Sequence, residues 1–400
     1  MRKAHRLEDL IFWYVFDRPS CLRNDLGHQF DISLATVSRA VSALLDHDLL
    51  IESSSEVAAP GRKPQSLRIN PKLAVLLGLD IQLEGVLAVV TDMAGTLLGR
   101  GAVRCNAEQG VDAVLRASLK AADAALEDAE IPRAEIRHIG VGHSGDLDIK
   151  NGVCVSWANA PSWKSIPIRD MLADTFEMDV TIDDRSRALA LAERRTSPAD
   201  WEHSEAVYIV CAFGVGMGFF VDGRLYRGAS QGGGEIGHTV IDSNGPLCRC
   251  GNRGCLEAYA GTVSILRYVQ DGLAAGATSS LRSTVEADFT LRAVASASHK
   301  GDALASAAID RAAKALGTAV ANMVQVLNPS LVVLCGELAR CAGAEILDAV
   351  KCAVQSQCVE TAARRVEIRL ARPKKDVSAI GCALLAAEAE ADRVLHAKLS

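Results

Sequence analysis

The sequence has 400 residues, of which 49% are hydrophobic and 23% are charged, and its formal net charge is −6. This length exceeds what one compact core holds and predicts two or three domains, and the composition is that of a globular protein. Its longest uncharged apolar stretch, residues 206–221, contains glycines and is shorter than the roughly 20 residues of a membrane helix. Residues 1–10 have no signal-peptide core, so we expect a cytoplasmic protein without a membrane partner.

The charge is unevenly distributed along the chain. Residues 1–72 contain ten Lys or Arg and nine Asp or Glu, a net charge of +1, which leaves −7 for the remainder. Charge alone therefore does not identify a nucleic-acid-binding protein. The twelve cysteines are mostly isolated, which argues against a disulfide scaffold.

The first 72 residues follow the pattern of a winged helix-turn-helix. Apolar periodicity and breakers predict helices over 6–16, 22–30 and 34–47, then strands over 49–51 and 66–69. Ser33 is the expected cap of the third helix. Its apolar face would be formed by Leu34, Val37, Val41, Leu44 and Leu45. The third helix would enter the major groove of DNA.

Polar and basic residues occur where this plan would contact DNA. Thr36, Ser38 and Arg39 lie at the start of the third helix, where hydroxyls and a guanidinium can bond bases or phosphates. Arg62 and Lys63 lie at the tip of the wing, where they suit phosphates or the minor groove. The alternative is a helical protein-interaction module. We favour double-stranded operator DNA as the partner because the polar helix start and the basic wing occur together.

Residues 73–400 alternate strands and helices, which predicts an α/β fold with a weak internal repeat. The first copy has strands over 74–80 and 85–92 and a third ending at 104; the second has strands over 206–213, 218–221 and 225–226. A helix over 303–327 and a strand over 331–334 follow. Two similar units of this kind predict two lobes with a cleft between them.

The clearest group of chemical residues is a metal site. Cys248, Cys250 and Cys255 follow His238 closely and would complete a Cys₃His set, the kind that zinc prefers. The alternative is three reduced cysteines in a flexible loop. The Cys-x-Cys-x₄-Cys spacing with a nearby His favours zinc, and four protein ligands predict a structural role.

Four carboxylates are candidates for a ligand site. Glu235 and Glu257 lie beside the metal ligands, so one ion would hold both where they can accept hydrogen bonds from sugar hydroxyls; each alone would be read as a surface charge. Asp183 and Asp184 end a predicted strand before a helix over 185–195. An aspartate there can act as a base toward a hydroxyl or cap the helix, and the two roles are compatible.

The sequence resembles the ROK family of repressors, open reading frames and kinases over essentially its whole length. The matching segments are 159–163, 183–184, 214–218, 234–238, 248–257, 328–329 and 377–381. The resemblance implies a two-lobed, actin-like ATPase and hexokinase (ribonuclease H-like) fold behind the winged helix-turn-helix of residues 1–72. Lobe one would comprise about 73–195 with 381–400, and lobe two about 196–380.

The resemblance also implies roles for particular residues. His238, Cys248, Cys250 and Cys255 would hold a structural Zn²⁺. The sugar contacts would be Asn159, Asp183, Asp184, Glu235, His238 and Glu257. Asp184 stands where kinase members have their catalytic base. Asp183 departs from the family, which usually has Asn there, so an amide donor has become an acceptor.

The nucleotide side departs further from the family's kinases. Gln82, Leu83 and Glu84 replace the Gly-Gly-Thr of the family's phosphate loop, removing close backbone approach and a hydroxyl and adding a negative charge. Phe213 replaces a polar residue before the second glycine loop, and Cys335 replaces one glycine of a pair. We therefore expect no catalytic residue and no bound ATP or Mg²⁺.

The resulting expectation is a sugar-responsive regulator of carbohydrate genes, most simply a repressor, that acts as a homodimer or homotetramer. A sugar bound between the lobes would alter their closure and so the spacing of two winged helices. One alternative is an active ATP-dependent sugar kinase with a DNA-binding arm, which Asp184 and the glycines of residues 214–218 support. The other is a regulator whose sensor domain binds a protein.

Overall fold

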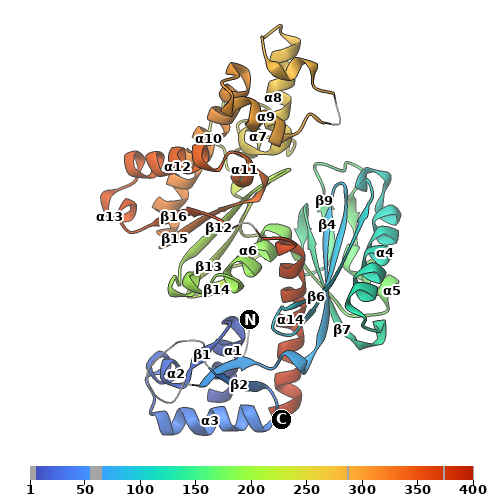
Figure 1. The fold of residues 1–400 in the computed structure, drawn as a ribbon, viewed down its shortest axis with the longest axis vertical. Coiled ribbons are helices and arrows are strands. Elements are labelled where there is room, and N and C mark those ends of the chain that lie inside the picture. Colours follow the sequence, from blue (N-terminus) through green and yellow to red (C-terminus); the bar gives the residue numbers. More distant parts are fainter. Residues whose placement is uncertain (1–5, 55–64, 286–287, 373, 400) are drawn as a thin grey trace. The chain divides into compact units, whose positions relative to one another are not determined.

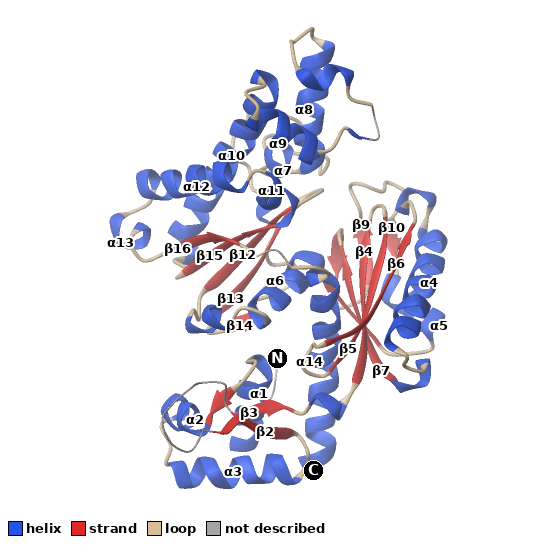
Figure 2. Cartoon of the chain, viewed as in Figure 1, coloured by secondary structure: helices blue, strands red, loops and turns tan. Residues whose placement is uncertain are grey.

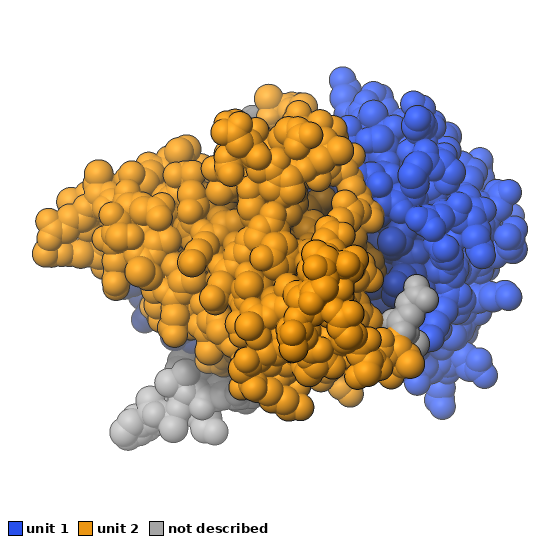
Figure 3. All heavy atoms as spheres, turned by 90° about the horizontal axis from the view of Figure 1, so that it is seen from above, with its two compact units in different colours: residues 1–201, 376–400 blue, residues 202–375 orange. Residues whose placement is uncertain are grey.

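The computed structural model describes residues 6–54, 65–285, 288–372 and 374–399. The chain forms two compact units, which are coloured separately in Figure 3. The first unit comprises residues 1–201 and 376–400, and the second comprises residues 202–375. Within the described ranges, no helix combines the length and the apolar character needed to cross a membrane.

The first unit begins with three helices and a small sheet, here called the N-terminal module. Its elements are α1 (Leu7–Asp17), β1 (Cys21–Leu22), α2 (Arg23–Phe30), α3 (Leu34–Asp46), β2 (Leu50–Ser54) and β3 (Gln65–Ile69) (Figure 1). The predicted helices and wing strands are present. The sequence missed β1, which pairs with β3 and makes the sheet three-stranded, in the order β1-β3-β2. Leu22 belongs to this strand and not to the predicted second helix.

The third helix shows why the local sequence folds as it does. The Ser33 hydroxyl accepts a hydrogen bond from the Thr36 amide at 3.2 Å, which confirms the predicted cap. Val37, Val41 and Leu44 are buried, as a 3.6-residue period requires. Leu34 was predicted to share this face, but it is 53% exposed because it lies in the first turn, beyond the reach of the core.

The rest of the first unit is a five-stranded sheet with helices on both faces (Figure 2). Its strands are β4 (Val75–Gln82), β5 (Gly85–Asp92), β6 (Leu97–Arg104), β7 (Ile136–His143) and β11 (Val180–Asp184). Helices α4 (Val111–Ala129) and α5 (Ile168–Phe176) share an apolar core with one face. Helices α6 (Arg185–Arg195) and α14 (Val377–Leu399) cover the other. A short sheet of β8 (Asp146–Asp148), β9 (Val153–Ser156) and β10 (Lys164–Ile166) lies beside it.

The second unit repeats the strand plan of the first. Its strands are β12 (Ala206–Cys211), β13 (Val215–Val221), β14 (Arg224–Leu225), β15 (Leu331–Cys335) and β16 (Glu367–Leu370). The order β14-β13-β12-β15-β16 mirrors β6-β5-β4-β7-β11, with an antiparallel hairpin on one side and parallel strands on the other. The internal repeat predicted from the sequence is therefore confirmed.

Helices complete the second unit. They are α7 (Glu257–Ala260), α8 (Thr262–Ala274), α9 (Leu291–His299), α10 (Ala303–Leu327), α11 (Gly336–Cys341), α12 (Gly343–Gln357) and α13 (Glu360–Ala363). The long helix α10 has the predicted bounds and contributes many small buried residues to the core. This explains how a chain with only 4% aromatic residues fills its interior.

The core of the N-terminal module continues into the C-terminal helix. Phe12, Leu26 and Leu44 belong to the same buried cluster as Ala387 and Leu395 of α14. The module and α14 thus lie in one compact unit. The domain boundaries expected from the sequence stay predictions.

Candidate ligand, metal and DNA-binding sites

Two predicted ligand residues end strand β11. Asp183 is 2% exposed, and its Oδ1 accepts hydrogen bonds from Arg187 Nε at 2.6 Å and from the Asp184 amide at 2.7 Å. Asp184 Oδ1 accepts from the amides of Ser186 and Arg187, so it caps α6 as predicted. Burial raises the pKa of Asp184 above its ordinary value. The pair is therefore already engaged by the first turn of α6.

A second acidic site lies near the end of β4, and its partners were not predicted from the sequence. Asp80 has no exposed surface, and its carboxylate accepts hydrogen bonds from Arg185 Nε at 2.6 Å and from Gln82 Nε2 at 2.7 Å. The Ser378 hydroxyl donates to the same carboxylate. Asp80 lies two residues before the segment that replaces the family's phosphate loop, and three side chains here take its acceptor sites.

His143 is a third feature that the sequence did not single out. It ends β7, in register with Asp184 of β11, and has no exposed surface. Trp157 and Trp163 lie against its ring, with centroids at 4.6 and 5.1 Å. Neither ring nitrogen has a hydrogen-bond partner among the described residues. Burial lowers the pKa of His143 to about 3, so the ring is neutral near pH 7.

The predicted ligand residue Asn159 lies in the turn that follows Trp157. It is half-buried, and the amide of Ala160 donates to the Trp157 carbonyl within the same turn. Asn159, Asp183 and Asp184 thus belong to the first unit, whereas Glu235, His238 and Glu257 belong to the second.

In the second unit, Glu257 opens α7 and contacts the second glycine loop. Its Oε2 accepts a hydrogen bond from the Val215 amide at 3.0 Å. A Cβ at Gly214 would lie 2.4 Å from this oxygen, so any other residue there would displace the Glu257 carboxylate from its hydrogen bond. That glycine therefore has a structural reason apart from nucleotide binding. Glu235 is exposed, just before the short helical turn Ile236–His238.

The four predicted metal ligands come together in the second unit. Their ligand atoms all lie within 4.8 Å of one another. Cys250 Sγ lies 3.7 Å from Cys255 Sγ, and Cys248 Sγ lies 3.8 Å from His238 Nδ1. Ligands about 2.0–2.3 Å from a tetrahedral ion are separated by distances of this size. The donor set and its geometry therefore fit a metal ion.

The loop between these ligands is ordered by its own backbone. The Cys248 amide donates to the Asn252 carbonyl at 2.7 Å, and the Leu256 amide donates to the Thr239 carbonyl at 3.0 Å. Cys248 and Cys255 are buried, whereas Cys250 is exposed. The ligands are thus preorganised by local hydrogen bonds.

The predicted DNA contacts lie on α3 and the wing. Ser38 and Arg39 are exposed. Thr36 is half-buried, and its hydroxyl is 3.0 Å from that of Ser33, so it serves the cap of the helix as well. Arg62 and Lys63 lie outside the described residues.

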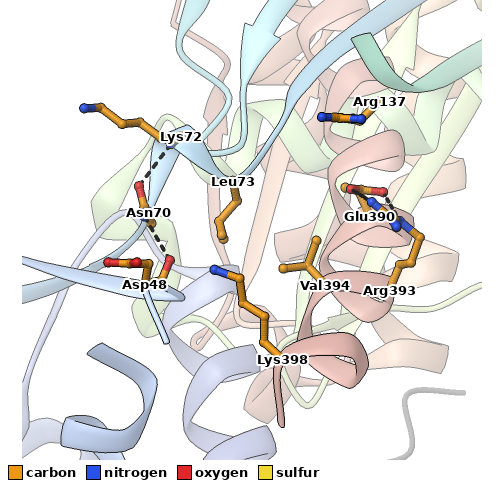
Figure 4. A pocket seen from close by; sticks show the side chains of 9 residues that line it. All are labelled: Asp48, Asn70, Lys72, Leu73, Arg137, Glu390, Arg393, Val394 and Lys398. Atoms are coloured by element: carbon orange, nitrogen blue, oxygen red, sulfur yellow. Dashed lines mark hydrogen bonds and ion pairs between the residues drawn. The ribbon is translucent and has the colours of Figure 1, made fainter. Parts of the chain in front are cut away.

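A cleft of about 610 Å³ lies where the N-terminal module meets α14 (Figure 4). Its lining residues are Asp48, Asn70, Lys72, Leu73, Arg137, Glu390, Arg393, Val394 and Lys398. Asn70 Nδ2 donates to the Asp48 carbonyl at 2.9 Å, and Arg393 holds the buried Glu390. Beside the cleft, Lys398 Nζ donates to the His47 carbonyl at 2.7 Å. The hydrogen bond from Lys398 to His47 thus links the C-terminal end of α3 to α14 beside the cleft.

Comparison with known proteins places these features in context. A family model described as the ROK family matches residues 76–389. A putative xylose repressor of Caldicellulosiruptor sp. (strain Rt8B.4) is 27% identical over 376 residues, 93% of each chain. A glucokinase of Thermotoga maritima is 30% identical over 274 residues, which are 68% of this chain and 84% of the relative.

A solved structure resembles the whole chain. The crystal structure of a ROK family transcriptional regulator, described as a homologue of the E. coli MLC protein, superposes with a TM-score of 0.74. It is 23% identical and covers 98% of this chain and 97% of its own. At this identity the likeness establishes the fold, and its coverage of 98% of this chain extends to the N-terminal module.

Proposed function

Because this chain belongs to the ROK family, we propose that it is a transcription regulator whose affinity for operator DNA is altered by a carbohydrate. The observation that carries this proposal is the N-terminal module, a winged helix-turn-helix joined to the family's two-lobed fold. A repressor relative that matches 93% of the chain supports it. The most economical direction of control is repression.

We propose that α3 reads the major groove with Ser38 and Arg39, and that Thr36 contacts the backbone. Arg62 and Lys63 of the wing would contact phosphates. Two copies would bind a palindromic operator, as helix-turn-helix dimers do. We therefore expect a homodimer or a homotetramer.

The carbohydrate would be recognised by Asn159, Asp183, Asp184, Glu235, His238 and Glu257. Carboxylates accept hydrogen bonds from sugar hydroxyls, and four of them disfavour a phosphorylated sugar at this place. His238 can serve both roles, because its Nδ1 faces the metal ligands and leaves Nε2 for the sugar.

We propose that the metal ion is zinc. Three thiolates and one imidazole complete its tetrahedral shell, so no position stays open for a substrate. When bound, the ion supplies no chemistry and holds the loop that carries His238 and leads to Glu257.

We propose further that the chain is not a kinase. Arg185, Gln82 and Ser378 donate hydrogen bonds to the carboxylate of Asp80, and the exposed Glu84 adds a negative charge in the turn after β4. Both features oppose the binding of a nucleotide and its metal. The competing function, an active sugar kinase, is favoured by the glucokinase relative and by Asp184 at the catalytic-base position.

Two measurements test the proposal. The first is the melting temperature of the full chain with D-xylose, D-glucose, N-acetylglucosamine, their phosphates and ATP with magnesium. We expect a free sugar, and not ATP, to raise it. Stabilisation by ATP, together with sugar-dependent ATP turnover that Asp184→Asn abolishes, would contradict the proposal.

The second measurement is selection of binding sites from random double-stranded DNA, followed by affinity at fixed salt. Arg39→Ala should weaken specific binding by about 1–3 kcal/mol. The exposed Arg116 of α4 offers a matched control, since Arg116→Ala should leave the affinity unchanged. Failure of the full chain to select any site would contradict DNA binding.

A further inference from the structure

Helix α6 begins at the proposed sugar site. Arg185, its first residue, binds Asp80 of β4, and Arg187 binds Asp183 of β11, each through Nε at 2.6 Å. Asp183 and Arg187 are almost fully buried. The first turn of α6 is thus joined to the acidic strand ends by charge-assisted hydrogen bonds, which are short and strong.

The other end of α6 contacts the N-terminal module. Arg195, its last residue, donates a hydrogen bond to the Phe16 carbonyl of α1, and its guanidinium lies 5.2 Å from the Phe16 ring. Arg194 lies 4.7 Å from the ring of Trp201. Arg18, which follows α1, contacts the same Trp201 ring at 5.5 Å and that of Tyr14 at 3.5 Å. A hydrogen bond to a backbone carbonyl and a series of cation–π contacts therefore connect the end of α6 to the end of α1.

Between its ends, α6 is a short and closely packed helix. Its eleven residues extend over about 16 Å. Ala188, Ala190 and Ala192 have no exposed surface. A Cβ at Gly381 of α14 would overlap the Ala188 carbonyl oxygen, so the two helices are in backbone contact. Close packing of this kind passes on a displacement instead of absorbing it.

We propose that α6 transmits effector binding to the N-terminal module, with Arg187 responding at Asp183 and Arg195 acting on α1. A ligand hydroxyl that donates to Asp183 Oδ1 competes with Arg187, because both lone pairs of that oxygen already accept hydrogen bonds, from Arg187 and from the Asp184 amide. Loosening of Arg187 displaces the first turn of α6. The displacement reaches Phe16 through Arg195 and changes how α1 supports α3. Arg187 and Arg195 are positioning residues in this proposal.

The identity of the effector rests on the proposed function, but the mechanical link does not. The link is tested without sugar or DNA, by hydrogen–deuterium exchange on the full chain. Arg187→Met should raise the exchange rates of amides 11–17 in α1 about tenfold. Helix α5 is the internal reference, because it belongs to the same unit and lies on the opposite face of the sheet.

A general loss of stability would raise exchange in α1 and α5 alike, and this result would overturn the proposal. The matched control is Arg116→Met, an exposed arginine on α4 of the same unit. It should change neither helix. Arg195→Met, at the far end, should raise α1 exchange to the same extent as Arg187→Met.

Arg187→Met leaves a buried carboxylate without its cation and can prevent folding. The double variant Asp183→Asn with Arg187→Met removes both charges and should fold. It should still show the selective, roughly tenfold increase in α1. Unchanged α1 exchange in this folded variant would refute the link.

The effector arm uses whichever of D-xylose, D-glucose and N-acetylglucosamine raises the melting temperature. In Arg195→Met this sugar should still raise the melting temperature. The factor by which the sugar changes DNA affinity should be at least ten times smaller than in the wild type. An unchanged factor would overturn the proposal. If no sugar binds the wild-type chain, the proposed function fails, and the exchange experiment still decides the link.

Discussion

At the scale of single residues, the ion pair between Arg185 and the buried Asp80 joins distant segments of the chain. Asp80 and Arg185 are 105 residues apart, and Ser378 lies a further 193 residues along the chain. The sequence predicts Asp80 at a strand end and Arg185 at a helix start. It does not predict that they meet, because side-chain pairing follows from how β4 and α6 pack.

Arg185→Met should lower the free energy of unfolding by about 3–5 kcal/mol, because it leaves the fully buried Asp80 without a cation. Adding Asp80→Asn to it should recover part of this loss. The measurement is denaturant unfolding followed by far-UV circular dichroism. Arg116→Met serves as the exposed control, with an expected change within about 0.5 kcal/mol. Equal effects of the two single variants would contradict the role of the pair.

His143 should make stability depend on pH. Its pKa is lowered to about 3 in the folded chain, against an ordinary value near 6.5. Below pH 6.5 the unfolded chain therefore takes up a proton that the folded chain does not, and stability falls as the pH falls toward 3. Lowering the pH from 6.5 to 5 should therefore reduce the free energy of unfolding by about 2 kcal/mol through this group.

His143→Phe keeps an aromatic ring between Trp157 and Trp163 and removes the titration. Unfolding free energies measured at pH 7, 6 and 5 should therefore fall less steeply in this variant than in the wild type. Parallel pH profiles for the two proteins would rule out the assignment.

At the scale of elements, the sequence predicted the three helices of the N-terminal module, the helices α6 and α10, and most strands of the two large sheets, since their apolar periods are clear. The bounds of α10 and of α6 match those expected. The two-residue strand β1 has no period to detect and exists because Cys21 and Leu22 pair with β3. Leu34 follows the apolar period of α3 but lies beyond the core at its end. Periodicity thus finds elements, and tertiary packing decides their ends.

The metal-binding loop was predictable because its ligands are close in sequence. Cys250→Ser should abolish the binding of one zinc per chain and lower stability by roughly 2 kcal/mol or more, a shift of about 4–8 °C. Metal content by mass spectrometry and the melting temperature measure both effects. Cys352→Ser, at an exposed cysteine of α12, is the matched control and should retain the metal. Zinc retained at full stoichiometry in Cys250→Ser would contradict the site.

At the scale of the whole molecule, the shared core links the first and last segments of the chain. Leu395→Ala should cost about 2–5 kcal/mol, because Leu395 is buried in the cluster that includes Phe12, Leu26 and Leu44. Amide exchange should accelerate in α3 more than in α4. Asp392→Ala, at an exposed position of the same helix, should leave α3 unchanged. Equal protection of α3 in Leu395→Ala and wild type would show that the cluster does not support the module.

The shared core also has a consequence for the order in which the protein is made. Domains generally fold as units, the N-terminal one first, during synthesis. Here most of the N-terminal module is translated before the second unit, but Ala386, Ala387, Ala391 and Leu395 of its core are translated after it. Until α14 has left the ribosome, the module lacks the part of its hydrophobic core that α14 supplies. A chain released early therefore carries an incomplete module, and every chain with a finished module also carries its complete sensor.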